Sequence, residues 1–218
     1  MAQIFPESAN WASKASILAG LLLAAIVLGV LLNINRIHYV NRVNIALDQP
    51  VPFSHKHHVT GLGIDCRYCH TSVEHGAFAG IPPTETCMTC HSQIWTEAPN
   101  LEPVRTSWRE NKPIEWNRVH DLPDFVYFNH SIHLAKGVGC QTCHGQVDQM
   151  PLMWKVNSLN MEWCIECHKN PEKFVRPKEQ VFSMTYRKPK NQEELGAQLV
   201  ADYNIQTQQL LNCSVCHR

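Results

Sequence analysis

The stretch CRYCH at residues 66–70 is the first of five copies of one pattern, Cys-x-x-Cys-His. The copies are Cys66–His70, Cys87–His91, Cys140–His144, Cys164–His168 and Cys213–His217. Together they contain all ten cysteines of the chain, namely Cys66, Cys69, Cys87, Cys90, Cys140, Cys143, Cys164, Cys167, Cys213 and Cys216. The repeated pattern therefore accounts for the whole thiol content of the protein.

This pattern has the spacing that covalent haem attachment requires. Two thiols separated by two residues can add to the two vinyl groups of a haem, and the adjacent histidine then becomes the proximal iron ligand. A disulfide framework needs no histidine after every second cysteine, and a zinc site would leave the histidines unexplained. The sequence predicts five haem c groups, with proximal ligands His70, His91, His144, His168 and His217.

Composition narrows the fold class. The chain has 218 residues, 13 histidines and a formal net charge of zero, so nothing in it favours a nucleic-acid partner. We expect a multihaem cytochrome c with one N-terminal transmembrane helix and a coil-rich domain of short helices. Its five covalent haems should supply much of the apolar core, with little or no β-sheet.

The amino-terminal segment has the character of a membrane anchor. Residues 16–34 (SILAGLLLAAIVLGVLLNI) carry no charge and would span about 28 Å as a helix. That length is close to the roughly 30 Å of a bilayer core. The run is longer than the apolar part of a signal peptide, and no small-x-small cleavage site follows it. We therefore expect one uncleaved transmembrane helix.

Charge near this helix gives a weak orientation signal. Lys14 precedes the helix whereas Arg36 and Arg42 follow it, which by itself favours the opposite orientation to the one expected. Haems of this kind are attached after export, in an oxidising compartment, and we give that constraint more weight. The chain is expected in a bacterial cytoplasmic membrane, with a cytoplasmic N-terminus and its haem domain on the periplasmic side.

An internal repeat organises the rest of the chain. The pattern Phe-x-His-x-x-His occurs at residues 53–58 and again at 128–133, and two haem motifs follow each copy. The predicted divisions are an anchor (1–35), a first di-haem unit with a bridging segment (36–126), a second di-haem unit (127–190), and a C-terminal helix with the fifth haem site (191–218). Asn191 and Glu194 predict a capping box for this last helix, which should continue into the fifth motif.

The distal iron ligands are predicted from the remaining histidines. The repeat singles out His55, His58, His130 and His133, whose three-residue spacing places each pair on one helix face. His120 is preferred as the distal ligand of the fifth haem, with Met150, Met153 or Met161 as alternatives. Ligation by a methionine thioether would raise that haem's potential. His38, His57 and His75 are expected at the surface.

The runs PVPFSHKHHV, CRYCHTSVE, IPPTETCMTCHS, VYFNHSIH, GCQTCHG and MEWCIECH resemble the pentahaem ActA subunits of bacterial alternative complex III. More distantly, the Phe-x-His-x-x-His pattern is similar to that of class III cytochromes c3 and c7. That resemblance implies that His55 ligates the haem at Cys66–His70 and His130 the haem at Cys140–His144. It also implies that His58 and His133 ligate other haems.

The resemblance to ActA further implies a role in a membrane complex. Such a complex contains an iron–sulfur protein, polytopic quinol-binding subunits and monohaem cytochromes. The pentahaem chain would relay electrons from quinol oxidation, in a respiratory or photosynthetic chain, towards a soluble cytochrome, a cupredoxin or a terminal oxidase. It would be no enzyme on its own and would have no catalytic residue.

Two other functions fit the sequence less well. A stand-alone NapC/NrfH-like quinol dehydrogenase, feeding a periplasmic reductase, also has a single anchor helix but a different haem pattern. A multihaem enzyme such as a nitrite reductase needs an open iron position, whereas all five motifs here end in histidine and enough distal candidates exist to close every site. The relay subunit is therefore preferred.

Overall fold

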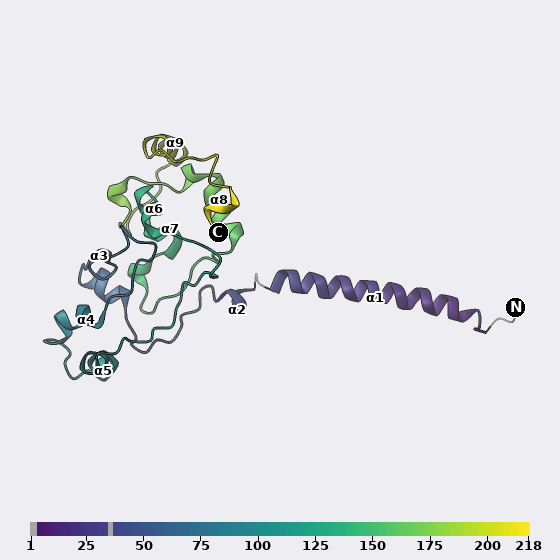
Figure 1. Ribbon diagram of the computed structural model, residues 1–218, viewed down its shortest axis with the longest axis horizontal. Helices are drawn as coiled ribbons and strands as arrows, with labels where there is room; N and C mark the ends of the chain where they lie inside the picture. The colour runs from purple at the N-terminus through teal and green to yellow at the C-terminus, as the bar shows by residue number, and fades with distance from the viewer. Residues whose placement is uncertain (1–3, 35–36) are drawn as a thin grey trace. The chain divides into compact units, whose positions relative to one another are not determined.

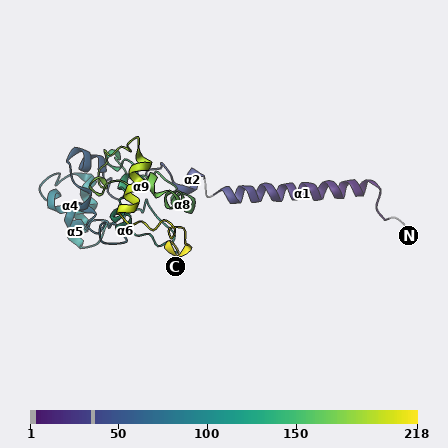
Figure 2. The same cartoon turned by 90° about the horizontal axis from the view of Figure 1, so that it is seen from above.

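The computed structural model describes residues 4–34 and 37–218 of the chain. The chain divides into two compact units, residues 1–42 and residues 43–218. The first unit is built on the long helix α1, and the second contains only short helices joined by extended and turning segments (Figures 1 and 2).

Helix α1 runs from Ser8 to Asn33 and has no buried residue. In the described part of the chain it is the one helix that is long and apolar enough to cross a membrane. The short helix α2 (His38–Asn41) follows and ends where Arg42 adopts a left-handed conformation, with φ 53°. Arg36, one of the two cationic residues that follow the apolar segment, lies outside the described residues.

The second unit is built from short helices, as predicted. Its α-helices are α3 (Cys66–Cys69), α4 (Thr84–His91), α5 (Glu102–Glu110), α6 (His130–Ala135), α7 (Cys140–His144), α8 (Met161–Lys169) and α9 (Gln192–Asp202). A π-helical turn, η2 (Lys56–Gly61), and the 3₁₀ turns η3 (Pro99–Leu101), η4 (Val147–Gln149), η5 (Pro171–Lys173), η6 (Lys178–Gln180) and η7 (Cys213–Val215) complete it. Within residues 4–34 and 37–218 no β-strand forms, and only three isolated bridges occur.

The apolar core of this unit is small. Seven hydrophobic side chains of the described residues are buried: Val51, Val73, Val104, Met150, Val175, Val181 and Leu199. A fully buried aliphatic side chain contributes about 1.5–3 kcal/mol, so this set falls far short of offsetting the ordering of so long a segment. The polypeptide alone therefore leaves much of the core to be supplied by apolar groups that it binds.

Helix α9 is held by a close backbone contact. A Cβ added at Gly196 would overlap the carbonyl group of Glu172 in η5. Gln192, buried in the first turn, donates from Nε2 to the carbonyl oxygens of Glu172 and Val175, both at 2.9 Å. Glycine and a buried amide thus allow α9 to lie directly on the η5 backbone.

The predicted extent of this C-terminal helix was wrong. Helix α9 ends at Asp202, well before the fifth motif, and the side chain of Asn191 makes no capping hydrogen bond. Beyond the helix, Lys136 Nζ donates to the carbonyl oxygen of Tyr203 at 2.6 Å, and Asn204 adopts a left-handed conformation with φ 49°. Tertiary contacts therefore end a helix that the local sequence pattern would have continued.

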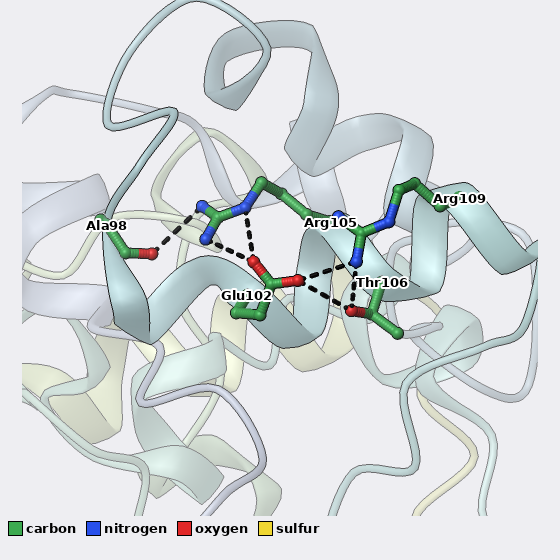
Figure 3. A network of polar contacts seen from close by, with 5 residues as sticks. All are labelled: Ala98, Glu102, Arg105, Thr106 and Arg109. Atoms are coloured by element: carbon green, nitrogen blue, oxygen red, sulfur yellow. Dashed lines mark hydrogen bonds and ion pairs between the residues drawn. The ribbon is translucent and has the colours of Figure 1, made fainter.

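Helix α5 supports the haem motif on α4. Thr84, the first residue of α4, forms a hydroxyl–hydroxyl hydrogen bond of 2.6 Å with the buried Ser107 of α5. On the solvent side of α5, Glu102 lies between the guanidinium groups of Arg105 and Arg109 (Figure 3). Hydrogen bonds from Arg109, Arg105 and Thr106 lower the pKa of Glu102 to about 2. This carboxylate remains charged and holds both arginines over the physiological pH range.

Replacing Gly196 with alanine should destabilise the second unit. Alanine favours a helix by about 1 kcal/mol over glycine, but forcing a methyl group into a packed contact costs about 3 kcal/mol. We expect the free energy of unfolding to fall by about 2 kcal/mol. Guanidinium unfolding followed by circular dichroism measures this change. Gln198→Ala, at an exposed position of the same helix, is the control, and equal stability of both variants would contradict the packing argument.

Candidate functional site

Each Cys-x-x-Cys-His motif lies on a helical turn of the second unit. The motifs occupy α3, α4, α7, α8 and η7, in chain order. Residues three apart on such a turn share one face, so the two thiols of each motif can reach the same partner. All ten cysteines are unpaired. The geometry of every motif therefore fits attachment of one haem through two thioether bonds.

The third motif is the most enclosed of the five. Burial raises the pKa of the Cys143 thiol to about 12 and that of Cys140 to about 11. Burial also lowers the pKa of His144 to about 3, and nearby histidines add to this effect. These thiols are not the low-pKa thiolates that serve as nucleophiles, and His144 is in the neutral form that binds iron.

Four of the five motif histidines make the same kind of hydrogen bond. Each uses Nδ1 to contact a backbone carbonyl oxygen, which leaves Nε2 available for an iron. The pairs are His70 with Gly80 (2.6 Å), His91 with Ile94 (3.3 Å), His168 with Leu210 (2.9 Å) and His217 with Phe125 (3.0 Å). No sequence pattern indicates these acceptors, because any residue can supply a backbone carbonyl.

The two Phe-x-His-x-x-His segments have nearly identical geometry. Phe53 meets His55 edge-on at 4.9 Å and stacks on His58 at 4.4 Å. In the second copy, Phe128 meets His130 edge-on at 4.8 Å and stacks on His133 at 4.5 Å. The first copy enters the π-helical turn η2 and the second enters α6, so the ring arrangement is kept although the helix type differs. We call each copy, residues 53–58 and 128–133, a histidine clamp.

Hydrogen bonds at Nδ1 also orient the clamp histidines. His58 Nδ1 lies 2.8 Å from the Ser54 carbonyl oxygen, and His133 Nδ1 lies 2.7 Å from that of Asn129. His130 Nδ1 lies 2.8 Å from the carbonyl oxygen of Ala77. His55 Nδ1 is buried without a hydrogen-bond partner, and burial lowers the pKa of His55 to about 4, with a further effect from His70.

Three clamp histidines face a motif histidine at one common distance. The ring centres of His58 and His91, of His130 and His144, and of His133 and His168 are each 6.3 Å apart. An imidazole nitrogen binds a metal at about 2 Å and its ring centre lies about 1 Å further, so two imidazoles on opposite sides of one iron have centres about 6 Å apart. These pairs therefore fit six-coordinate haem iron, and His55 lies beside His70.

The candidates for the remaining distal position are placed differently. His120 Nε2 lies 3.2 Å from Nδ1 of His144. Met150 is 1% exposed, and its carbonyl oxygen accepts from the backbone N–H of Lys56. Met153 is half-buried, whereas Met161 is 63% exposed and lines a groove along α8. The aromatic ring lying against His217 in the described structure is that of Phe125, at 5.8 Å.

The surface histidines were predicted correctly where the structure describes them. His57 and His75 are both exposed. The side chain of His38 lies outside the described residues.

One contact between motifs, together with the ionisable neighbours of the cysteines, indicates the order of the motifs in space. Tyr68 in the first motif hydrogen-bonds Thr89 in the second at 2.9 Å. Burial is the main cause of the raised pKa of Cys140, and the nearby thiol of Cys66 is the next largest cause. For Cys143 the next largest cause is the thiol of Cys167. Cys216 has the same effect on Cys164. The motifs therefore follow one another in the order second, first, third, fourth and fifth, and Figure 1 shows α4, α3, α7 and α8 in this succession.

These features fit a protein that holds several haems, each through two thioethers and a histidine. The family model of cytochrome c7 and related cytochromes c matches residues 126–218. The chain is also 31% identical over 144 residues to the multihaem cytochrome c subunit of a menaquinone reductase from Nitratidesulfovibrio vulgaris, an alignment covering 56% of this chain and 69% of that protein. The chain belongs to the multihaem cytochromes c, and it binds haem c covalently.

Removal of Asp65 should loosen the first motif. Its side chain caps α3 by accepting from the Arg67 backbone N–H at 2.8 Å, and hydrogen bonds from the Arg67 side chain lower the pKa of Asp65. Asp65→Ala should lose about 1 kcal/mol of folding free energy at pH 7.

This deficit should depend on pH. Because the Asp65 pKa is lower in the folded state than its value of about 3.9 in the unfolded chain, the carboxylate stabilises above that value. The stabilisation is lost as pH falls through the folded-state pKa. Guanidinium unfolding at pH 7 and below pH 3 measures it, with Glu85→Ala as the control because no side chain caps α4. An equal deficit at both pH values would exclude a contribution from the charged form.

Proposed function

We propose that this chain is the electron-relay subunit of a membrane quinol-oxidising complex, with five haems between its redox partners. The observation that carries the proposal is the unbroken spatial series of five motifs, in which two histidine clamps each join two neighbouring sites. His55 and His58 would serve the first and second haems, and His130 and His133 the third and fourth. Histidine on both sides of the iron suits electron transfer, because it leaves no open position for a substrate.

The fifth haem would be held by Cys213, Cys216 and His217 at one end of this series. Its distal ligand is then His120, or one of Met150, Met153 and Met161, as the sequence suggested. Bound haem supplies the one-electron chemistry. The chain's own residues hold the iron, set its potential and exclude water, and none of them breaks a substrate bond.

The partners follow from the family and the anchor. We infer that α1 holds the chain in a bacterial cytoplasmic membrane, with the N-terminus in the cytoplasm and residues 43–218 in the periplasm. The complex would resemble alternative complex III and include an iron–sulfur protein, polytopic quinol-binding subunits and monohaem cytochromes. Electrons would leave towards a soluble cytochrome, a cupredoxin or a terminal oxidase.

The similarity to a menaquinone reductase subunit favours a second direction of flow. In that case the same series of haems would carry electrons from a periplasmic donor towards the quinone. The arrangement of the motifs serves either direction, because a linear series has two ends at which electrons can enter.

His130→Ala should open one iron position in the purified chain. We expect one low-spin haem to become high-spin, visible in the absorption and electron paramagnetic resonance spectra, and electron transfer along the series to slow. His75→Ala, at an exposed histidine, is the matched control and should remain low-spin. The intact mass of both proteins should include five haems. An unchanged low-spin spectrum in His130→Ala would remove His130 from the set of ligands.

Purification from membranes in mild detergent tests the function itself. We expect polytopic subunits, an iron–sulfur protein and monohaem cytochromes to accompany the chain. Haem reduction by a quinol analogue, compared with reduction by a periplasmic donor, then gives the direction of flow. Recovery of the chain alone, or with only a periplasmic reductase, would instead support a NapC/NrfH-like quinol dehydrogenase.

A further inference from the structure

His144 differs from the other motif histidines in what its Nδ1 contacts. The other four reach backbone carbonyl oxygens, whereas Nδ1 of His144 lies 3.2 Å from Nε2 of His120. The two rings are 4.3 Å apart between centres and inclined at 69°, so one ring edge points at the other. The third motif, at the middle of the series, is thus the one site in the described structure with an imidazole at this position.

We propose that His120 is a positioning residue for the third haem, accepting the Nδ1–H of His144 at its own Nε2, and is no distal iron ligand. This inference rests on the proposed role of His144 as an iron ligand. It replaces the assignment of His120 to the fifth haem and leaves the methionines as the sequence candidates there.

The chemistry of the two rings fixes the direction of this hydrogen bond. A histidine that binds iron through Nε2 carries its proton on Nδ1 and can only donate there. His120 must then present an unprotonated Nε2 and hold its own proton on Nδ1. With Nε2 accepting and Nδ1 protonated, neither nitrogen of His120 has a free lone pair for an iron. An iron at Nε2 would also have to share its space with the His144 ring.

His144 also lies beside a second histidine, His130. The His130 ring lies nearly parallel to the His144 ring, at 8°, with centres 6.3 Å apart. His130 and His144 thus have the separation of two ligands on one iron, whereas Nε2 of His120 lies against Nδ1 of His144. Three histidines from different segments meet at this site, but only two have the geometry to bind the metal.

The expected effect is on the reduction potential. An acceptor at Nδ1 makes an imidazole a stronger donor to the metal, which favours the oxidised iron, and it also fixes the plane of the ring. Loss of such a partner typically changes a metal site's affinity or activity 10–100-fold. Loss of the His120 acceptor should therefore raise the potential of the third haem relative to its neighbours.

Two substitutions separate the possible roles of His120. His120→Gln can keep an acceptor oxygen near the position of Nε2, whereas His120→Leu removes it. We expect every haem to keep its spin state in both variants. In His120→Leu the equilibrium constant for reduction of one haem should rise about tenfold. For one electron this corresponds to a reduction potential about 59 mV higher. In His120→Gln the shift should be smaller.

Absorption and electron paramagnetic resonance spectra give the spin state, and potentiometric titration of the purified full-length chain gives the potential. His75→Leu, at an exposed histidine outside both clamps, is the control. A high-spin haem in either His120 variant would overturn the proposal in favour of a distal ligand. Unchanged potentials in His120→Leu would overturn it as well. If His120→Leu loses haem by mass, His120→Gln decides by the spin-state criterion.

This outcome is independent of the partners of the chain. A failure to recover the membrane complex would count against the relay function but would leave the spectra and potentials of the isolated chain unaffected. Conversely, a high-spin His120 variant would change the ligand assignment without bearing on the complex.

Discussion

The hydrogen bond at histidine Nδ1 is the interaction on which the domain's haem arrangement depends. An imidazole has two nitrogens, and the partner of one decides where the other points. Here the partners are mainly backbone oxygens, from segments as remote from the motif as Leu210 is from His168 and Phe125 is from His217. Folding of the coil regions and orientation of the proposed iron ligands are therefore coupled, because the loops supply the acceptors.

The same constraint explains why so little regular structure is enough. A side chain that must reach an iron on one side and a carbonyl on the other needs only a short helical turn to present it, and α3 and α7 are no longer than that. The two histidine clamps then set the spacing between sites, since one turn directs two imidazoles to two different motifs. The aromatic residue at the start of each clamp fixes both rings by packing against them.

Much of this could be read from the sequence, and the remainder has physical reasons. The motif spacing and the repeated Phe-x-His-x-x-His are local patterns, so the short helices at the motifs and the anchor helix were predictable. The end of α9 was not, because it depends on Lys136 reaching Tyr203 from a distant segment. The order of the motifs in space was also hidden, and so was the partner of His120, whose ring could have served as a ligand by composition alone.

The succession of the motifs in space has a consequence for assembly. In each clamp the facing histidine precedes, along the chain, the motif histidine that it faces, as His58 precedes His91 and His133 precedes His168. His120 likewise precedes His144. In the proposed orientation, the segments nearest the N-terminal anchor are exported first. Each of these imidazoles would thus reach the periplasm before the thiol pair that binds the haem. Haem attachment can then proceed from the N-terminal side of the domain. Each newly attached haem would meet a facing histidine that has already been exported.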